Sequence, residues 1–321
     1  MRLSEAIEAL AIATRANGRS PRTVQAYREK LRPLLAFLGD VDVASITTAD
    51  LRRFVASLME QTTTYRDHPH RRERDRPLSE FTIAGHVRAL KRLFRFLADD
   101  GIITASPAQR IRTPQPKRDR PKGMANADLL RLLATCDGGS ALDRRDKALI
   151  LLLADTACRV SGLCGLRLGD LNLDQHRAIV TEKGSKARVL FFTEPTARAL
   201  ASWLAVRPAD RGDAVFVGLG PRSQGPLSAS SVAKVLTMRG RRAGVSGPVN
   251  PHSLRHAFAR DYLTSGGDLA TLSDILGHTS VAVTKAFYAV FTTQELQAKH
   301  AQHSPIARLL GDDGGDDGKR L

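Results

Sequence analysis

A proline-rich, charged stretch divides this sequence into two parts. Residues 104–123 read TASPAQRIRTPQPKRDRPKG, with four prolines and almost no apolar side chains. Because proline fixes φ and lacks a backbone N–H, this stretch continues neither a helix nor a sheet, and we expect an extended basic linker. The linker separates a first domain, residues 1–103, from a second domain, residues 124–311. Residues 312–321 form a Gly/Asp-rich tail, which we expect to be disordered.

The first domain is expected to be helical. Apolar residues recur with a 3.6-residue period in four segments, which begin near residues 3, 21, 48 and 79. Ser20 followed by Pro21 is a typical helix start, and Gly39 is a typical stop. Pro33, inside the second segment, predicts a kink or an early break. The Arg-rich residues 65–77, before the fourth segment, fit a solvated loop and a phosphate-binding loop equally well.

The second domain combines helices with a small sheet. A long apolar helix is predicted over about residues 144–158. The sequence HRAIVTEKGSKARVLFF, residues 176–192, alternates around a Lys-Gly-Ser-Lys turn as a β-hairpin does. Residues 214–218 predict another short strand. Helices are expected to start at the caps Thr193, Ser228, Asn250 and Asp268. The expected fold class is therefore α-rich and two-domain, with a small antiparallel sheet in the second domain.

The charge balance indicates a polyanionic partner. Lys and Arg total 49 against 33 Asp and Glu, which gives a net charge of +16 and a pI of about 10.4. Because these charges are spread over both halves, they favour nucleic acid over a basic surface without a partner. The sequence shows no signal peptide and no apolar run long enough to cross a membrane. Cys136, Cys158 and Cys164 lack metal-ligand spacing and fit a reducing compartment, so we expect a cytoplasmic protein without membrane contact.

Residues 251–288 concentrate side chains that can carry chemistry. His252 and Arg255 lie three residues apart, on one face of a predicted helix. His278 follows a glycine that ends another helix. Tyr288 is turned by about 100° from Phe287, which belongs to an apolar stripe, so the phenol can point toward His252 and Arg255. Elsewhere, Arg159 follows the long apolar helix and Lys183 lies at the hairpin turn.

Each of these residues alone has an ordinary explanation. Arg159 is more often a salt-bridge residue, Lys183 a solvated turn residue, and His278 a helix cap. As a set they match the cleavage of a phosphodiester. Two arginines can hold its non-bridging oxygens, a tyrosine can attack once a neighbour takes its proton, a lysine can protonate the leaving 5′-hydroxyl, and histidines can move protons. No metal or other cofactor is expected, since guanidinium groups supply the positive charge.

The order of these motifs resembles the phage integrase family of tyrosine recombinases, including its Xer-type members, over nearly the whole chain. SPRTVQAYREKLRPLLAFLG resembles the second helix of the family's core-binding domain. ACRVSGLCGLRLGDLNL and TEKGSKARVLFF resemble the segments that carry the first catalytic arginine and the catalytic lysine. PHSLRHAFA resembles the His-x-x-Arg box, and LGHTSVAVTKAFYAVF resembles the segment that ends in the nucleophile. The resemblance implies the catalytic residues Arg159, Lys183, His252, Arg255, His278 and Tyr288.

The resemblance also implies a site-specific DNA recombinase, encoded by a bacterium or a phage and associated with the nucleoid. Its two domains are expected to form a C-shaped clamp on double-stranded DNA, with four protomers around two recombination sites. Tyr288 would form a 3′-phosphotyrosyl link and free a 5′-hydroxyl. Residues 292–310 would dock into a neighbouring protomer. Four linker residues are candidates for contact with the DNA backbone: Lys117, Arg118, Arg120 and Lys122.

The sequence departs from the family pattern at two places. Gly162 stands three residues after Arg159, where the family often has an acidic residue. Tyr288 follows His278 by ten residues where nine is common, and position nine is Phe287. Gly162 leaves open a DNA-binding protein of this fold with weak or lost catalysis, and a type IB topoisomerase-like enzyme is a chemical rival. The chain length, the N-terminal helices and the five motifs favour the recombinase.

Overall fold

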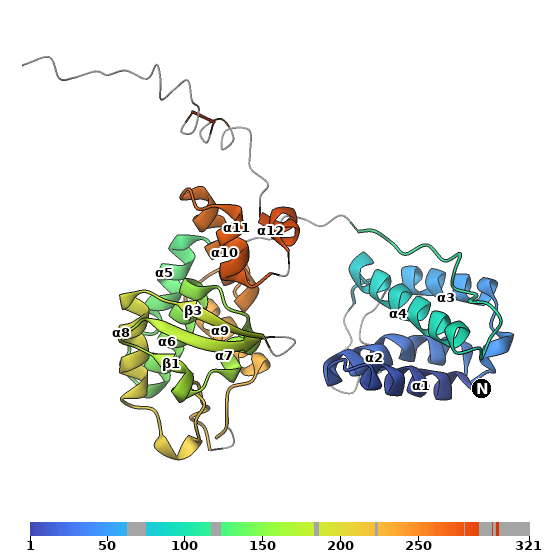
Figure 1. The fold of residues 1–321 in the computed structure, drawn as a ribbon, viewed down its shortest axis with the longest axis horizontal. Coiled ribbons are helices and arrows are strands. Elements are labelled where there is room, and N and C mark those ends of the chain that lie inside the picture. Colours follow the sequence, from blue (N-terminus) through green and yellow to red (C-terminus); the bar gives the residue numbers. More distant parts are fainter. Residues whose placement is uncertain are drawn as a thin grey trace, which may run out of the picture. The chain divides into compact units, whose positions relative to one another are not determined.

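The computed structural model describes residues 1–62, 75–116, 123–182, 186–221, 224–278, 280–288, 297 and 300–301. The chain forms two compact units, Met1–Asp119 and Arg120–Leu321, each with a hydrophobic core of its own (Figure 1). Most of the Arg-rich segment 65–77, the docking segment 292–310 and the tail 312–321 lie outside the described residues. The structure confirms the expected fold class, which is mainly helical with one small antiparallel sheet.

The helices of the first unit begin where short polar side chains cap them. They are α1 (Leu3–Ala16), α2 (Pro21–Leu38), α3 (Thr48–Glu60) and α4 (Glu80–Asp99), with a 3-10 turn at Val43–Ser45. Ser20 and Ser79 accept hydrogen bonds from N–H groups in the first turns of α2 and α4, and Thr47 forms a capping box with Asp50. The sequence predicts a kink or an early break at Pro33, and α2 continues through Pro33 to Leu38, so the early break does not occur.

The core of the first unit takes in part of the predicted linker. Ala108 and Ile111 are buried among the apolar side chains of this core, and the Thr48 hydroxyl donates to the Pro107 carbonyl at 2.8 Å. Residues 104–111 therefore pack with the first unit, although the sequence indicated that the linker begins at residue 104. The reason is that Ala108 and Ile111 bury their apolar side chains in this core. Residues 117–122, with the four basic linker residues, lie outside the described part.

The sheet of the second unit has the order β1-β2-β3 and is antiparallel throughout. Its strands are β1 (Leu171–Asn172), β2 (Arg177–Glu182) and β3 (Lys186–Phe191). Val180 pairs with Arg188, and Ile179 with Val189. Successive side chains of a strand point to opposite faces of the sheet, so Val180 is buried while Ile179 and Val189 are exposed. The strand expected at residues 214–218 is instead a buried apolar segment with isolated bridges at Ala214 and Val217.

Helices cover the buried face of this sheet and complete the second core. Helix α6 (Ala141–Thr156) is the long apolar helix that the sequence predicts, and it packs against α8 and α10. Helices α10, α11 and α12 contact one another and appear together in orange to red in Figure 1. The remaining helices are α5 (Asn126–Ala134), α7 (Val160–Gly165), α8 (Glu194–Leu204), α9 (Ala229–Arg242), α10 (Pro251–Thr264), α11 (Leu269–Leu276) and α12 (Val281–Tyr288), with 3-10 turns at Leu168–Asp170 and Ala209–Arg211.

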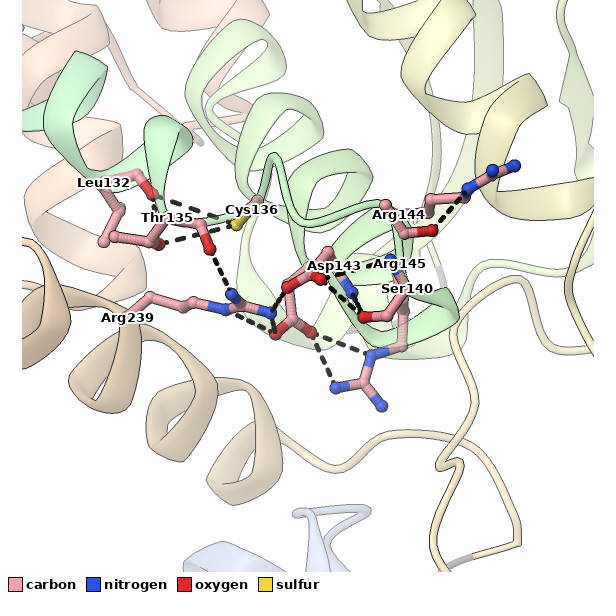
Figure 2. Close-up of polar contacts among 10 residues, drawn as sticks. Leu132, Thr135, Cys136, Ser140, Asp143, Arg144, Arg145 and Arg239 are labelled. Atoms are coloured by element: carbon pink, nitrogen blue, oxygen red, sulfur yellow. Dashed lines mark hydrogen bonds and ion pairs between the residues drawn. The ribbon is translucent and has the colours of Figure 1, made fainter.

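A buried ion network ties α6 to α9 in this unit (Figure 2). The carboxylate of Asp146 is fully buried. It accepts hydrogen bonds from Arg145 at 2.7 and 3.0 Å and from Arg239 Nε at 2.8 Å. Arg239 also pairs with Asp143 at 2.8 Å and donates to the Thr135 carbonyl at 2.6 Å. The buried charges therefore have partners, as a buried ion pair needs in order to offset its desolvation.

Candidate active site

The first turn of α10 sets the positions of three site residues. Asn250 accepts a hydrogen bond from the Ser253 N–H at 3.0 Å in a capping box, and proline follows it at the first helical position. The helix therefore starts at a fixed residue. Positions 252, 255 and 256 are then spaced i, i+3 and i+4, so His252, Arg255 and His256 share one face.

Arg255 is buried and held by named partners. Its Nη1 donates to the Ala157 carbonyl at 2.6 Å, and its Nη2 donates to the Leu276 carbonyl at 2.7 Å. Nη2 also lies 3.0 Å from Nε2 of His278. Burial and the nearby charge of Arg159 lower the pKa of Arg255 to about 10, so the guanidinium remains charged at neutral pH.

Three arginines converge on the carboxyl end of α11. Arg188 Nη1 donates to the Ile275 carbonyl, Arg255 to Leu276, and Arg159 Nη2 to the Gly277 carbonyl at 3.1 Å. The last carbonyls of a helix lack intrahelical partners and carry partial negative charge, so they attract cations. The end of α11 therefore orients guanidinium groups that come from three distant parts of the chain.

His278 lies between this cluster and α12. An arginine N–H can only donate, so His278 Nε2 accepts from Arg255, and the ring proton is on Nδ1. Nδ1 donates to the buried hydroxyl of Thr284 at 2.7 Å. Burial, and then the charges of Arg255, Arg159 and Arg188, lower the pKa of His278 to about 4. The imidazole is therefore neutral at physiological pH.

Tyr288 ends α12 with its ring in a small apolar core and its hydroxyl in the polar cluster. It is 8% exposed and packs with core residues that include Ala157, Leu272 and Leu276. The hydroxyl lies 2.9 Å from Nδ1 of His256. Burial raises the pKa of Tyr288, and this effect is opposed by the charge of Arg255 and a hydrogen bond from it. The phenol therefore stays protonated at neutral pH.

The predicted site residues thus fall into three groups. Arg159, Arg255, His278 and Tyr288 form one connected cluster. His252 is exposed at the edge of this cluster, and its ring centroid lies 6.4 Å from that of His256. Lys183 lies outside the described residues, between the ends of β2 and β3.

The structure adds three residues that the sequence analysis did not single out. His256 bonds to Tyr288, Arg188 joins the arginine cluster, and Thr284 binds His278. His256 could have been found from its i+4 spacing to His252. Arg188 could have been found as a charged residue on the inward face of a β-strand. It lies two residues before Leu190 and therefore on the same face of the strand. Thr284 gives no comparable signal, because only the three-dimensional arrangement brings its hydroxyl to His278.

Gly162 is buried in α7 against the sheet. A Cβ atom added there would lie 3.3 Å from Cβ of Val180, a tight contact. In this chain Val180 therefore packs tightly against the place where the family often has an acidic side chain. Within the described ranges, no three His, Cys, Asp or Glu side chains are grouped so as to hold a metal ion. None of the helices described combines the length and apolar character needed to cross a lipid bilayer.

Comparison with known proteins identifies the class. The phage integrase family matches residues 122–294, and the N-terminal SAM-like domain of phage integrases matches residues 11–68. The tyrosine recombinase XerC of Haemophilus influenzae is 31% identical over 294 residues, which cover 90% of this chain and 93% of that protein. XerC of Alcanivorax borkumensis is 30% identical and covers 92% of each chain. A solved structure of the Tn1549 transposon integrase with circular intermediate DNA has the same fold, with a TM-score of 0.70, 19% identity and coverage of 92% of this chain and 98% of that one.

The chain therefore belongs to the phage integrase family, as a Xer-like tyrosine recombinase. It is a site-specific recombinase that cleaves and rejoins DNA strands through a tyrosine-linked intermediate.

Proposed function

We propose that Tyr288 is the nucleophile of this recombinase and that Arg159 and Arg255 hold the phosphate it attacks. The phenol oxygen forms a bond to phosphorus, and the bond from phosphorus to the 5′-oxygen breaks. The product is a 3′-phosphotyrosyl link with a free 5′-hydroxyl. A 5′-hydroxyl from a partner strand reverses the step, so the link stores the bond energy and no nucleotide triphosphate is needed.

The observation that carries this proposal is the position of the Tyr288 oxygen within a preorganised positive cluster. A guanidinium has five N–H groups, and the four bonds to Ala157, Leu276, His278 and Tyr288 orient that of Arg255 without using all of them. A cation held in place before the reaction needs no reorganisation when charge develops on the phosphoryl oxygens. Removal of one such donor typically slows a reaction by about 10²–10³-fold.

Lys183 is proposed as the acid that protonates the leaving 5′-oxygen. In the sequence it directly follows Glu182, and the pairing of β2 with β3 runs to Glu182 and Lys186. His252, exposed at the edge of the cluster, is proposed to bind the phosphate or its leaving group. His278 is proposed to hold the guanidinium of Arg255 in position, because its Nε2 accepts a hydrogen bond from that group.

The assembly is proposed to be a homotetramer on two specific recombination sites. The net charge of +16 supports tight contact with duplex DNA. Lys117, Arg118, Arg120 and Lys122 are proposed to contact the DNA backbone, and residues 292–310 are proposed to join neighbouring protomers. Residues 117–122 and most of residues 292–310 lie outside the described residues, so the sequence alone supports these two proposals.

Substitution of Tyr288 tests the proposed function. On a nicked suicide duplex, which traps the covalent intermediate, Tyr288→Phe is expected to form no protein–DNA adduct. DNA affinity is expected to stay nearly unchanged, because only one hydroxyl is lost. Tyr262→Phe is the matched control, since Tyr262 packs beside Phe258 on α10, and this variant should form the adduct normally. An adduct formed by Tyr288→Phe would show that another residue is the nucleophile.

A further inference from the structure

The nucleophile of this site needs a proton acceptor. Tyr288 is buried, burial raises the pKa of its phenol, and the oxygen therefore carries its proton at neutral pH. A phenol is a weak nucleophile until that proton leaves. The acceptor must lie within hydrogen-bond distance of the phenol oxygen. It must also have a nitrogen or oxygen lone pair that is available to bind the proton.

We propose that His256 accepts the proton of Tyr288 during DNA cleavage and returns it during rejoining. This proposal rests on the role of Tyr288 as nucleophile. Nδ1 of His256 lies 2.9 Å from the phenol oxygen, within the range for direct proton transfer. The two rings are tilted at 51° with centroids 5.4 Å apart, so they are not stacked.

The other described side chains of the cluster fit this role less well. Arginine has no acceptor, which excludes Arg159 and Arg255. His278 lies parallel to the Tyr288 ring, at 8° and 6.3 Å between centroids, and both of its nitrogens are engaged by Arg255 and Thr284. The ring of His252 stacks on that of His256, with centroids 6.4 Å apart, whereas the contact of 2.9 Å to the Tyr288 oxygen is made by His256.

The protonation state of His256 is suited to acceptance. Burial and the neighbouring His252 and Arg255 lower the pKa of His256, so its imidazole is neutral at pH 7. The charged or titratable groups that face this ring in the described structure are His252 and Arg255 from α10 and Tyr288 from α12. The phenol is a stronger hydrogen-bond donor than a neutral imidazole N–H, so the bond runs from the Tyr288 hydroxyl to Nδ1, and the ring proton of His256 is on Nε2.

Every proton that moves in the proposed step has a donor and an acceptor. As the phenol oxygen bonds to phosphorus, its proton moves to Nδ1 and His256 becomes an imidazolium. The leaving 5′-oxygen receives a different proton from the proposed acid, Lys183. On rejoining, the incoming 5′-hydroxyl gives up its proton on that side, and the departing phenolate takes its proton back from His256. One pair of residues thus serves both directions, as reversible strand exchange requires.

The test uses the full chain and a suicide duplex with sulfur as the 5′-bridging atom, because a thiolate leaves without a proton and the rate then reports on the nucleophile alone. In wild type, the rate of adduct formation should rise with pH through a pKa below 6.5 and then remain level. In His256→Asn, the amide can still accept a hydrogen bond but cannot take the proton. The rate at pH 7 should fall by about 10²–10⁴-fold and then climb roughly tenfold per pH unit toward the pKa of the phenol.

The controls separate this inference from the proposed function. His176→Asn is the matched substitution, because His176 lies at a surface turn with φ of 48°, a conformation that asparagine tolerates, and its partner Glu194 is half exposed. It should keep the wild-type rate and profile. An adduct with Tyr288→Phe would overturn the proposed function. No adduct with Tyr288→Phe, together with a wild-type rate and level profile for His256→Asn, would overturn the role of His256 alone.

A second variant covers the case in which asparagine disturbs the fold. His256→Ala leaves a space beside the Tyr288 oxygen that free imidazole can enter. Adduct formation by this variant should be slow and should recover with added imidazole, to a plateau at high concentration. Absence of recovery in a variant that still binds DNA would contradict proton transfer at this position.

Discussion

Single hydrogen bonds decide the chemical state of the residues around Tyr288. His278 accepts from Arg255 on one ring nitrogen and donates to Thr284 from the other, so its tautomer follows from its partners. Protonation of Nε2 would place two donors against each other beside three positive charges. The residue is therefore built to stay neutral, which lets it orient Arg255 without adding to the charge of the cluster.

This arrangement predicts a pH dependence of stability. The folded-state pKa of His278, about 4, lies below the ordinary value of about 6.5. Its contribution to stability is therefore complete above pH 6.5 and is lost as the pH falls from 6.5 to 4. Chemical denaturation at several pH values should show that wild type loses its advantage over His278→Gln across this window. A constant difference between the two proteins from pH 8 to 4 would contradict the neutral state of His278.

At the scale of elements, the carboxyl end of α11 and the ion network between α6 and α9 organise the second unit. Three successive carbonyls of α11 receive Arg188, Arg255 and Arg159, so a shift of this helix would move all three guanidinium groups together. The network around Asp146 joins α6 to α9 through Arg239.

Loss of one charge from that network should be costly. Asp146→Asn keeps the shape of the side chain but leaves the buried Arg145 and Arg239 without their shared anion. We expect a decrease of about 3–5 kcal/mol in the free energy of unfolding, as for other buried pairs with one partner removed. Asp213→Asn is the control, since its pair with Arg167 is about two-thirds exposed and should contribute under about 1 kcal/mol. Equal effects in urea denaturation would show that burial of the network does not matter.

The sequence predicted those elements whose signals are local. Helices with caps such as Ser20 and Asn250 start at the expected residues, because the cap and the apolar period both lie within one or two turns. The segment 214–218, expected to be a strand, pairs only through isolated bridges at Ala214 and Val217, and a continuous apolar run does not by itself determine the type of buried element. His256 was missed for a related reason. Its partner Tyr288 is 32 residues away, and the bond depends on how α10 and α12 pack.

At the scale of the whole molecule, the two units have separate cores. The apolar residues of the first core all lie between Leu3 and Ile111, and those of the second lie from Met124 onward. The charge is divided as well, since Lys and Arg outnumber Asp and Glu by seven in residues 1–116 and by nine in the remainder. Each unit therefore has the means to fold alone and to attract DNA alone.

We accordingly expect a fragment of residues 1–116 to fold and to bind duplex DNA without the second unit. It should unfold in one cooperative transition, because its core contains no residue from beyond Ile111. The slope of log K against log salt concentration should be smaller for the fragment than for the full chain. Each phosphate neutralised adds about −0.9 to this slope, and the fragment has fewer cationic side chains to neutralise phosphates. Fluorescence anisotropy from 50 to 300 mM salt would measure both slopes. Equal slopes would place all phosphate contacts in the first unit, and a fragment that does not fold would show that its core needs the rest of the chain.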